Sequence, residues 1–132
     1  MKKSLLLLSC CFLVIAAFAQ TKSVAENLAQ QQLDAYNNRD IEAFLLPYSD
    51  SVEVYQFSNK LLYKGKETMR SQYKDMFADT KDLHCTLVKR IVLGNKVIDE
   101  ESVLFNTSKP PFRAIAIYII ENNKIAKVYF MQ

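Results

Sequence analysis

Histidine is nearly missing from this chain of 132 residues, because His84 is the only one. Metal sites in proteins are built from clustered histidine, cysteine and carboxylate side chains. One histidine and scattered carboxylates do not form such a ligand set, so the sequence predicts no metal site. No other cofactor is expected, and the chain contains no internal repeat or low-complexity segment.

A hydrophobic run long enough to span a membrane is also missing. Two lysines precede an apolar run from Leu5 to Ala16, which is too short for a transmembrane helix. Ala17-Phe18-Ala19 follows, with the small-x-small form of a signal-peptide cleavage site. We therefore expect a secretory signal peptide over residues 1–19 and a mature chain that begins at Gln20.

An alternative reading of this segment is a lipoprotein signal. Leu7-Leu8-Ser9-Cys10 loosely resembles a lipobox, but cleavage there leaves a very short apolar region before the cysteine and an apolar tail after it. Ordinary cleavage fits better. Either reading predicts export, to the periplasm or the extracellular medium.

The chain that remains after signal-peptide cleavage has little excess charge and no second cysteine with which Cys85 could pair. Removing residues 1–19 leaves 113 residues, enough for one domain with a single core. The formal net charge falls from +3 to +1 because two lysines are lost, and a near-neutral domain offers no electrostatic basis for binding nucleic acid. Cys85 is the only cysteine left, so no intramolecular disulfide can form. We expect a buried structural thiol rather than a nucleophile.

Helical spacing of apolar residues is present in the first half of the domain. A possible capping box at Ser23 is followed by a stripe at Ala25, Leu28, Ala29 and Tyr36, which predicts a first helix. Gln32 lies inside this stripe and therefore points at an apolar interior.

Two more helices follow. Asp40 can cap a short second helix from Ile41 to about Leu46. Gly65 precedes a third helix, in which the apolar residues are Met69, Tyr73, Met76 and Phe77.

The remaining segments predict strands. They are Val52–Phe57, Leu61–Lys64, Leu83–Leu93, Lys96–Phe105, Phe112–Glu121 and Lys124–Met131. The last four form two hairpins, through Gly94-Asn95 and Asn122-Asn123. Helices followed by antiparallel strands indicate an α+β fold, with the helices on one face of a bent sheet.

The tight turn at Gly94-Asn95 predicts the register of the first hairpin. If Leu93 pairs with Lys96, Arg90 lies opposite Asp99, Lys89 opposite Glu100 and His84 opposite Phe105. One face then carries His84, Thr86, Val88, Arg90, Asp99, Glu101, Val103 and Phe105. The other carries Leu83, Cys85, Leu87, Ile91, Ile98, Ser102 and Leu104.

Four segments resemble a known superfamily: Ala35–Ala43, Tyr48-Ser49-Asp50, Gly65-Lys66-Glu67 and Asn123–Val128. On these residues the mature chain resembles, over its whole length, the nuclear transport factor 2-like superfamily, which includes ketosteroid isomerases and SnoaL-like cyclases. The resemblance implies a cystatin-like cone, in which a curved antiparallel sheet wraps around three helices and leaves a pocket at its open end. It also implies that residues 20–132 are one SnoaL-like domain, often dimeric through the outer face of the sheet.

The resemblance does not extend to the isomerase chemistry. Anchored on Asp40, it places the oxyanion-hole tyrosine of ketosteroid isomerases at Gln32, their general-base aspartate at Gln56 and their proton-sharing aspartate near Ala116. Since a glutamine cannot shuttle a proton near neutral pH, that mechanism is not expected here.

The same anchor puts the Asp99 and Glu101 face inside the cone. Glu101 and His84 are the candidate catalytic residues: Glu101 has no evident partner, and His84 titrates near neutral pH, although both can also be structural. The predicted pocket residues are Gln32, Tyr36, Tyr48, Gln56, Tyr73, Asp99, Phe105, Tyr118 and Phe130. Asp99 most simply pairs with Arg90. Burial should raise the pKa of Glu101 unless Arg90 or Lys89 reaches it.

Three functions fit these residues. The first is an exported binding module that holds a small apolar or aromatic molecule in the cone. The second is a SnoaL-like isomerase or cyclase that uses Glu101 or His84 for proton transfer, and the third is a non-catalytic dimerisation module. We expect no nucleic acid partner and no membrane contact after signal cleavage. The apolar outer strip Leu87, Ile91, Ile98 and Leu104 predicts a homodimer.

Overall fold

The computed structural model describes residues 21–132. The predicted signal peptide, its cleavage site and the lipobox-like segment lie outside these residues. The order of elements is α1 (Val24–Asn38), α2 (Ile41–Leu45), β1 (Tyr48–Gln56), β2 (Lys60–Lys64), α3 (Lys66–Asp79), β3 (His84–Leu93), β4 (Lys96–Leu104), β5 (Phe112–Glu121) and β6 (Lys124–Met131). The α+β class and the order predicted from the sequence are therefore confirmed.

The first two helices begin at the predicted caps. The Ser23 hydroxyl accepts a hydrogen bond from the backbone N–H of Glu26, and the Asp40 carboxylate accepts one from that of Ala43. Each side chain satisfies an N–H that has no partner within its own helix. Arg39, between the helices, has a left-handed backbone with φ of 54° and ends α1 sharply.

The strands form one six-stranded sheet in the order β2-β1-β6-β5-β4-β3. The neighbours are antiparallel, as the predicted antiparallel sheet requires, except β1 and β6, which pair in parallel. The parallel pair arises because α3 and the strands β2 to β5 intervene between β1 and β6. It joins the N-terminal helical unit to the last strand of the sheet.

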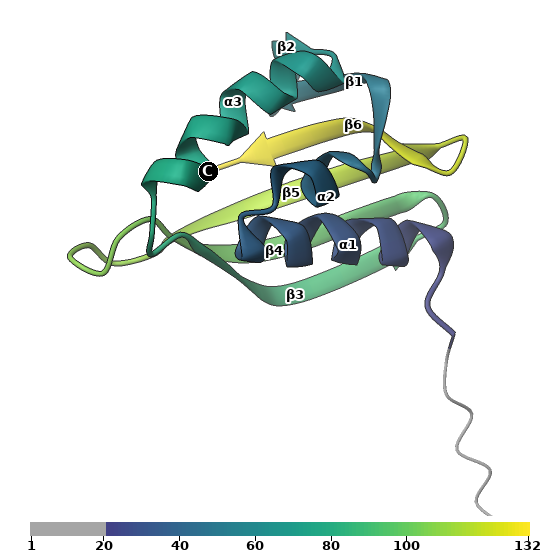
Figure 1. Cartoon of the computed structure of the whole chain (residues 1–132). Coiled ribbons are helices and arrows are strands. Elements are labelled where there is room, and N and C mark those ends of the chain that lie inside the picture. The colour runs from purple at the N-terminus through teal and green to yellow at the C-terminus, as the bar shows by residue number, and fades with distance from the viewer. Residues whose placement is uncertain (1–20) are drawn as a thin grey trace, which may run out of the picture.

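The helices lie on the concave face of this curved, unclosed sheet (Figure 1). On this face, α1 packs on β3 and β4, near one edge of the sheet, and α3 packs on β1 and β2, near the other edge. The core between the layers includes Ala29 of α1, Phe44 of α2 and Met69 of α3, all at most 1% exposed. This is the cone that the resemblance implied.

A bulge in β3 changes the predicted faces of the first hairpin. Leu93 pairs with Lys96 and Arg90 with Asp99, as predicted. The register then shifts at Val88, so that Leu87, not Val88, lies opposite Glu101. An extra residue in one strand reverses which side chains face the core beyond it.

The residues of β3 that precede the bulge lie on the opposite faces from those predicted. Cys85 and Leu87 turn inward, where Cys85 joins Leu33 and Val103 in a small cluster and Leu87 packs against it. His84 pairs with Leu104 instead of Phe105 and is exposed. The predicted inward position of His84 and the predicted outward position of Leu87 are therefore both wrong.

Candidate functional site

A cavity of about 300 Å³ lies between the helices and the concave face of the sheet. Nine aromatic side chains line it: Tyr36, Phe44, Tyr48, Tyr63, Tyr73, Phe105, Phe112, Tyr118 and Phe130. Several of these rings pack on one another, with ring centroids 4.6 Å apart between Phe44 and Tyr73 and 6.4 Å apart between Tyr36 and Tyr73. Mostly apolar walls with a few polar groups are the usual form of a small-molecule site.

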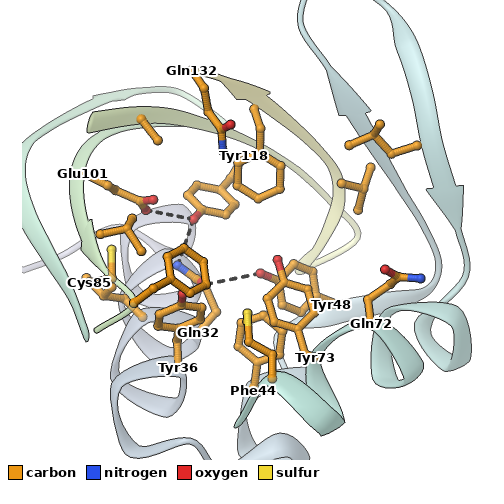
Figure 2. A pocket seen from close by; sticks show the side chains of 18 of the residues that line it. Gln32, Tyr36, Phe44, Tyr48, Gln72, Tyr73, Cys85, Glu101, Tyr118 and Gln132 are labelled. Atoms are coloured by element: carbon orange, nitrogen blue, oxygen red, sulfur yellow. Dashed lines mark hydrogen bonds between the residues drawn. The ribbon is translucent and has the colours of Figure 1, made fainter. Parts of the chain in front are cut away.

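Four polar side chains inside the cavity form one hydrogen-bonded chain (Figure 2). The Tyr48 hydroxyl donates to Oε1 of Gln32 over 3.3 Å, and Nε2 of Gln32 donates to the Tyr118 hydroxyl over 2.9 Å. The Tyr118 hydroxyl in turn donates to Oε1 of Glu101 over 3.3 Å. The chain joins β1, α1, β5 and β4, so it ties the helical layer to the sheet.

The direction of this chain is fixed by the backbone of α1. Nε2 of Gln32 also donates to the carbonyl oxygen of Ala29 over 3.1 Å, and a carbonyl can only accept. The amide nitrogen of Gln32 must therefore face Ala29 and Tyr118, and its oxygen must face Tyr48. The Tyr118 hydroxyl oxygen accepts a hydrogen bond from Gln32, so its own O–H is free to donate to Glu101. All three donors thus point along the chain toward the carboxylate.

Burial controls the ionisation of these groups. Glu101 is 6% exposed, and its pKa is raised from the ordinary 4.5 to about 7, chiefly because of burial and next because of the negative charge of Asp99. The hydrogen bonds from Tyr118 and Cys85 and the charge of Arg90 act against this rise. Burial also raises the pKa of Tyr118 and Tyr48 well above 10, so both hydroxyls remain protonated donors at neutral pH.

Arg90 forms its salt bridge with Asp99 and not with Glu101. Its Nε and Nη2 donate to the two oxygens of Asp99 over 2.7 and 2.6 Å, and Nη1 donates to Gln30 of α1 over 2.8 Å. Asp99 is fully buried, and the bidentate pair satisfies both of its oxygens. This pairing holds Arg90 away from the neighbouring Glu101, whose pKa is raised in the direction that its burial predicts.

Comparison with known proteins places this chain in a family. A model of the SnoaL-like domain matches residues 29–128. The chain belongs to the SnoaL-like domain family. The match begins within α1, includes α2, α3 and the strands β1 to β5 in full, and ends within β6.

Solved structures share the SnoaL-like fold. A cystatin-fold protein from Novosphingobium aromaticivorans has a TM-score of 0.74 at 24% identity, covering 85% of this chain and 100% of that one. A SnoaL-like protein from Burkholderia thailandensis has a TM-score of 0.69 at 18% identity, covering 84% and 96%. A putative polyketide cyclase from Sinorhizobium meliloti has a TM-score of 0.66 at 14% identity, covering 80% and 94%. No curated protein matches this chain. At these identities, the solved structures show the fold alone.

Most of the predicted pocket residues meet in the SnoaL-like cone. Those that line the cavity are Gln32, Tyr36, Tyr48, Tyr73, Glu101, Phe105, Tyr118 and Phe130. Phe105 lies at the mouth, where it is 40% exposed and stacks on Phe112 with ring centroids 5.6 Å apart. They come from α1, β1, α3, β4, β5, β6 and the loop after β4.

Three predicted residues lie outside the cavity. His84 is exposed on the outer side of β3, because the Val88 bulge turns it away from the helices. Gln56 is exposed at the end of β1, beyond the last buried residue of that strand, Val54. Asp99 faces the helices as predicted, but it is covered by Arg90 and does not line the cavity.

Several cavity residues were not predicted. Cys85 was assigned to the opposite face, and the bulge that brings it inward has no sequence signature, since Val88 is an ordinary strand residue. Burial raises the pKa of the Cys85 thiol far above its usual range, which fits a structural thiol. Phe44, Tyr63, Gln72, Met76 and Gln132 also line the cavity. The helical spacing that marked Met76 as apolar was the only sequence feature that pointed to any of them.

Two further features bear on the site. Within residues 21–132, no three histidine, cysteine or acidic side chains come close enough together to hold a metal ion. No helix of that part of the chain is long and apolar enough to cross a membrane.

Proposed function

We propose that this SnoaL-like protein binds a small apolar or aromatic molecule in its cone. The observation that carries this proposal is the cavity of about 300 Å³, with nine aromatic side chains and one polar chain that ends at Glu101. Cavities of about 300 to 1,000 Å³ hold small ligands. The exposed Leu62 and Phe105 line the mouth and offer a way in.

The binding test fills the cavity. Ala114 lines it on β5, and Ala126 lies on β6 outside it, partly buried. With 1-naphthalenemethanol as a neutral probe, calorimetry should detect binding to the wild type, and Ala114→Leu should weaken binding at least tenfold. Ala126→Leu is the matched control and should bind as the wild type does. Equal binding by both variants, or no binding to the wild type, would contradict the proposal.

The second candidate is a proton-transfer enzyme, and the ionisation of Glu101 favours it. A carboxylate whose pKa is about 7 can both take up and release a proton at neutral pH. By the resemblance to ketosteroid isomerases, the catalytic groups of those enzymes would fall at Gln32, at Gln56 and near Ala116, none of which can replace them. Any such reaction therefore depends on Glu101 alone, with Tyr118 to hold the carboxylate in place.

A ketone probe tests the enzymatic candidate. Glu101 would take a methyl proton from 2-acetylnaphthalene and return a deuteron from D₂O to the enolate. Exchange in D₂O, followed by NMR, should be faster with the wild type than in buffer and should be lost in Glu101→Gln. Exchange at the buffer rate would leave the protein a binding module only.

We also infer that the protein is exported and that its mature chain begins at Gln20. Ala17-Phe18-Ala19 supports this inference. Mass spectrometry of the secreted form should give the mass of residues 20–132. A lipid on Cys10 would contradict it.

A further inference from the structure

The cavity contains charge of one sign only. Among residues 21–132, Glu101 is the one charged side chain that lines it, and no lysine, arginine or histidine does. The nearest guanidinium, that of Arg90, is held by both oxygens of Asp99 and by Gln30. When Glu101 ionises, its charge therefore has no basic partner in the protein.

The walls of the cavity have the same electrostatic preference. Aromatic rings carry negative charge on their faces and attract cations. Tyr118 lies beside Glu101 (Figure 2), and Tyr36 and the other rings line the same cavity. A carboxylate surrounded by aromatic rings suits an ammonium group better than it suits a neutral or anionic one.

We propose that the ligand is a lipophilic amine, whose protonated nitrogen lies at Glu101 and whose apolar body lies among the aromatic rings. This inference rests on the proposed function, because it assigns a chemical class to the ligand of the same cavity. The ammonium supplies the positive charge that the protein does not. An organic acid would place a second negative charge beside Glu101 and would be excluded.

The geometry of the hydrogen-bonded chain supports a cation at this position. Gln32 donates to the Tyr118 hydroxyl, and Tyr118 donates to Glu101, so the carboxylate acts as an acceptor. Oε1 of Glu101 accepts from Tyr118, and an ammonium, with three donor hydrogens, can bond to the carboxylate as well. Burying an unpaired charge is costly, and an ion pair with the ligand removes much of that cost.

This arrangement also makes binding depend on pH. The titratable groups that face Glu101 are Asp99 on β4, Cys85 and Arg90 on β3, Tyr118 on β5, Tyr36 on α1 and Tyr48 on β1. The tyrosines and Cys85 stay neutral near pH 7, since burial raises the pKa of each. Protonation of Glu101, whose pKa is about 7, removes the charge that holds the amine. Affinity for the amine should therefore fall about tenfold from pH 8 to pH 6.

Three probes with one ring system test the inference on the purified protein. They are 1-naphthylmethylamine, 1-naphthalenemethanol and 1-naphthoic acid, which are positive, neutral and negative at pH 8. Calorimetry at pH 8 should show the amine binding at least tenfold tighter than the alcohol, and no binding of the acid. Glu101→Gln should abolish the preference for the amine, while Glu121→Gln, an exposed control, should keep it.

The outcomes separate this inference from the proposed function. Binding of the alcohol as tightly as the amine, or tighter binding of the acid, would overturn the inference that the ligand is an amine. It would still support the proposal that the cavity binds a small molecule. No binding of any probe would contradict the proposed function itself. If Glu101→Gln does not fold, the wild type between pH 8 and pH 6 decides. A constant ratio of amine to alcohol affinity over that range would overturn the inference.

Discussion

Between about pH 4.5 and pH 7, Glu101 holds a proton in the folded protein that it would release in the unfolded chain. Its pKa is about 7 in the fold and 4.5 as an ordinary glutamate. Below pH 4.5 both states are protonated, and the stability is at its full value. Between pH 4.5 and pH 7 the folded state binds more protons than the unfolded state, so stability falls as the pH rises. Above pH 7 the loss is complete.

Glu101→Gln should therefore be more stable than the wild type at pH 8, because the amide carries no charge. The gain should be at most about 3 kcal/mol at pH 8 and should vanish below pH 4.5. Urea unfolding at several pH values measures it. Glu121→Gln should follow the wild type throughout. A gain that does not depend on pH would mean that Glu101 is not the group responsible.

The pair between Arg90 and Asp99 is a second residue-scale test. Arg90→Met leaves a fully buried carboxylate without its partner and should cost about 3–5 kcal/mol. It should also raise the pKa of Glu101 further, because it removes a positive charge. Arg90→Met combined with Asp99→Leu should recover most of the lost stability, as measured by urea unfolding. If Arg90→Met alone were as stable as the wild type, the pair between Arg90 and Asp99 would not contribute to stability.

At the scale of elements, β3 is the strand whose faces are set by a bulge. The Val88 bulge places Cys85 inward and His84 outward. Deleting Val88 would remove the extra residue and exchange these faces, burying a histidine and exposing a cysteine. We expect a loss of roughly 3 kcal/mol or more in urea unfolding.

A deletion elsewhere controls for chain shortening. Ser108 lies in the exposed loop between β4 and β5, and its deletion should cost roughly 1 kcal/mol or less. Equal effects of the two deletions would mean that the bulge does not determine the faces of β3.

The same bulge marks the limit of what the sequence predicts. Caps, helical stripes and the Gly94-Asn95 turn are local features, and they predicted α1, α2 and the pairing of Arg90 with Asp99. The inward position of Glu101 followed from that register and from the resemblance. A bulge depends on how the whole sheet curves around the helices, and Val88 carries no residue type that announces it. His84 and Cys85 were therefore assigned to the wrong faces.

At the scale of the whole molecule, one row across the outer face of the sheet is apolar over five strands. Ile91, Ile98, Ile117, Tyr129 and Tyr55 are successive register partners on β3, β4, β5, β6 and β1. Ile91 is 51% exposed. We propose a homodimer through this row, which keeps Ile91 and Ile98 of the predicted strip. It omits Leu104 and the inward Leu87, and it adds Ile117, Tyr129 and Tyr55.

Light scattering at tens of micromolar protein tests the dimer. The wild type should have twice the mass of one chain, and Ile117→Lys, in the middle of the row, should have the mass of one. Thr86→Lys, also on the outer side of β3 but outside the row, should remain dimeric. A monomeric wild type would contradict this assembly.

Direct titration of the Glu101 carboxyl tests the central claim, that among residues 21–132 this buried group is the one charged side chain that lines the cavity. Carbon-13 NMR of the side-chain carboxyl, followed from pH 4 to pH 9, should give an apparent pKa of about 7. The assignment is confirmed if the titrating signal is missing from Glu101→Gln. A pKa near 4.5 would show that the carboxyl is solvated or paired with a base, and would contradict the account.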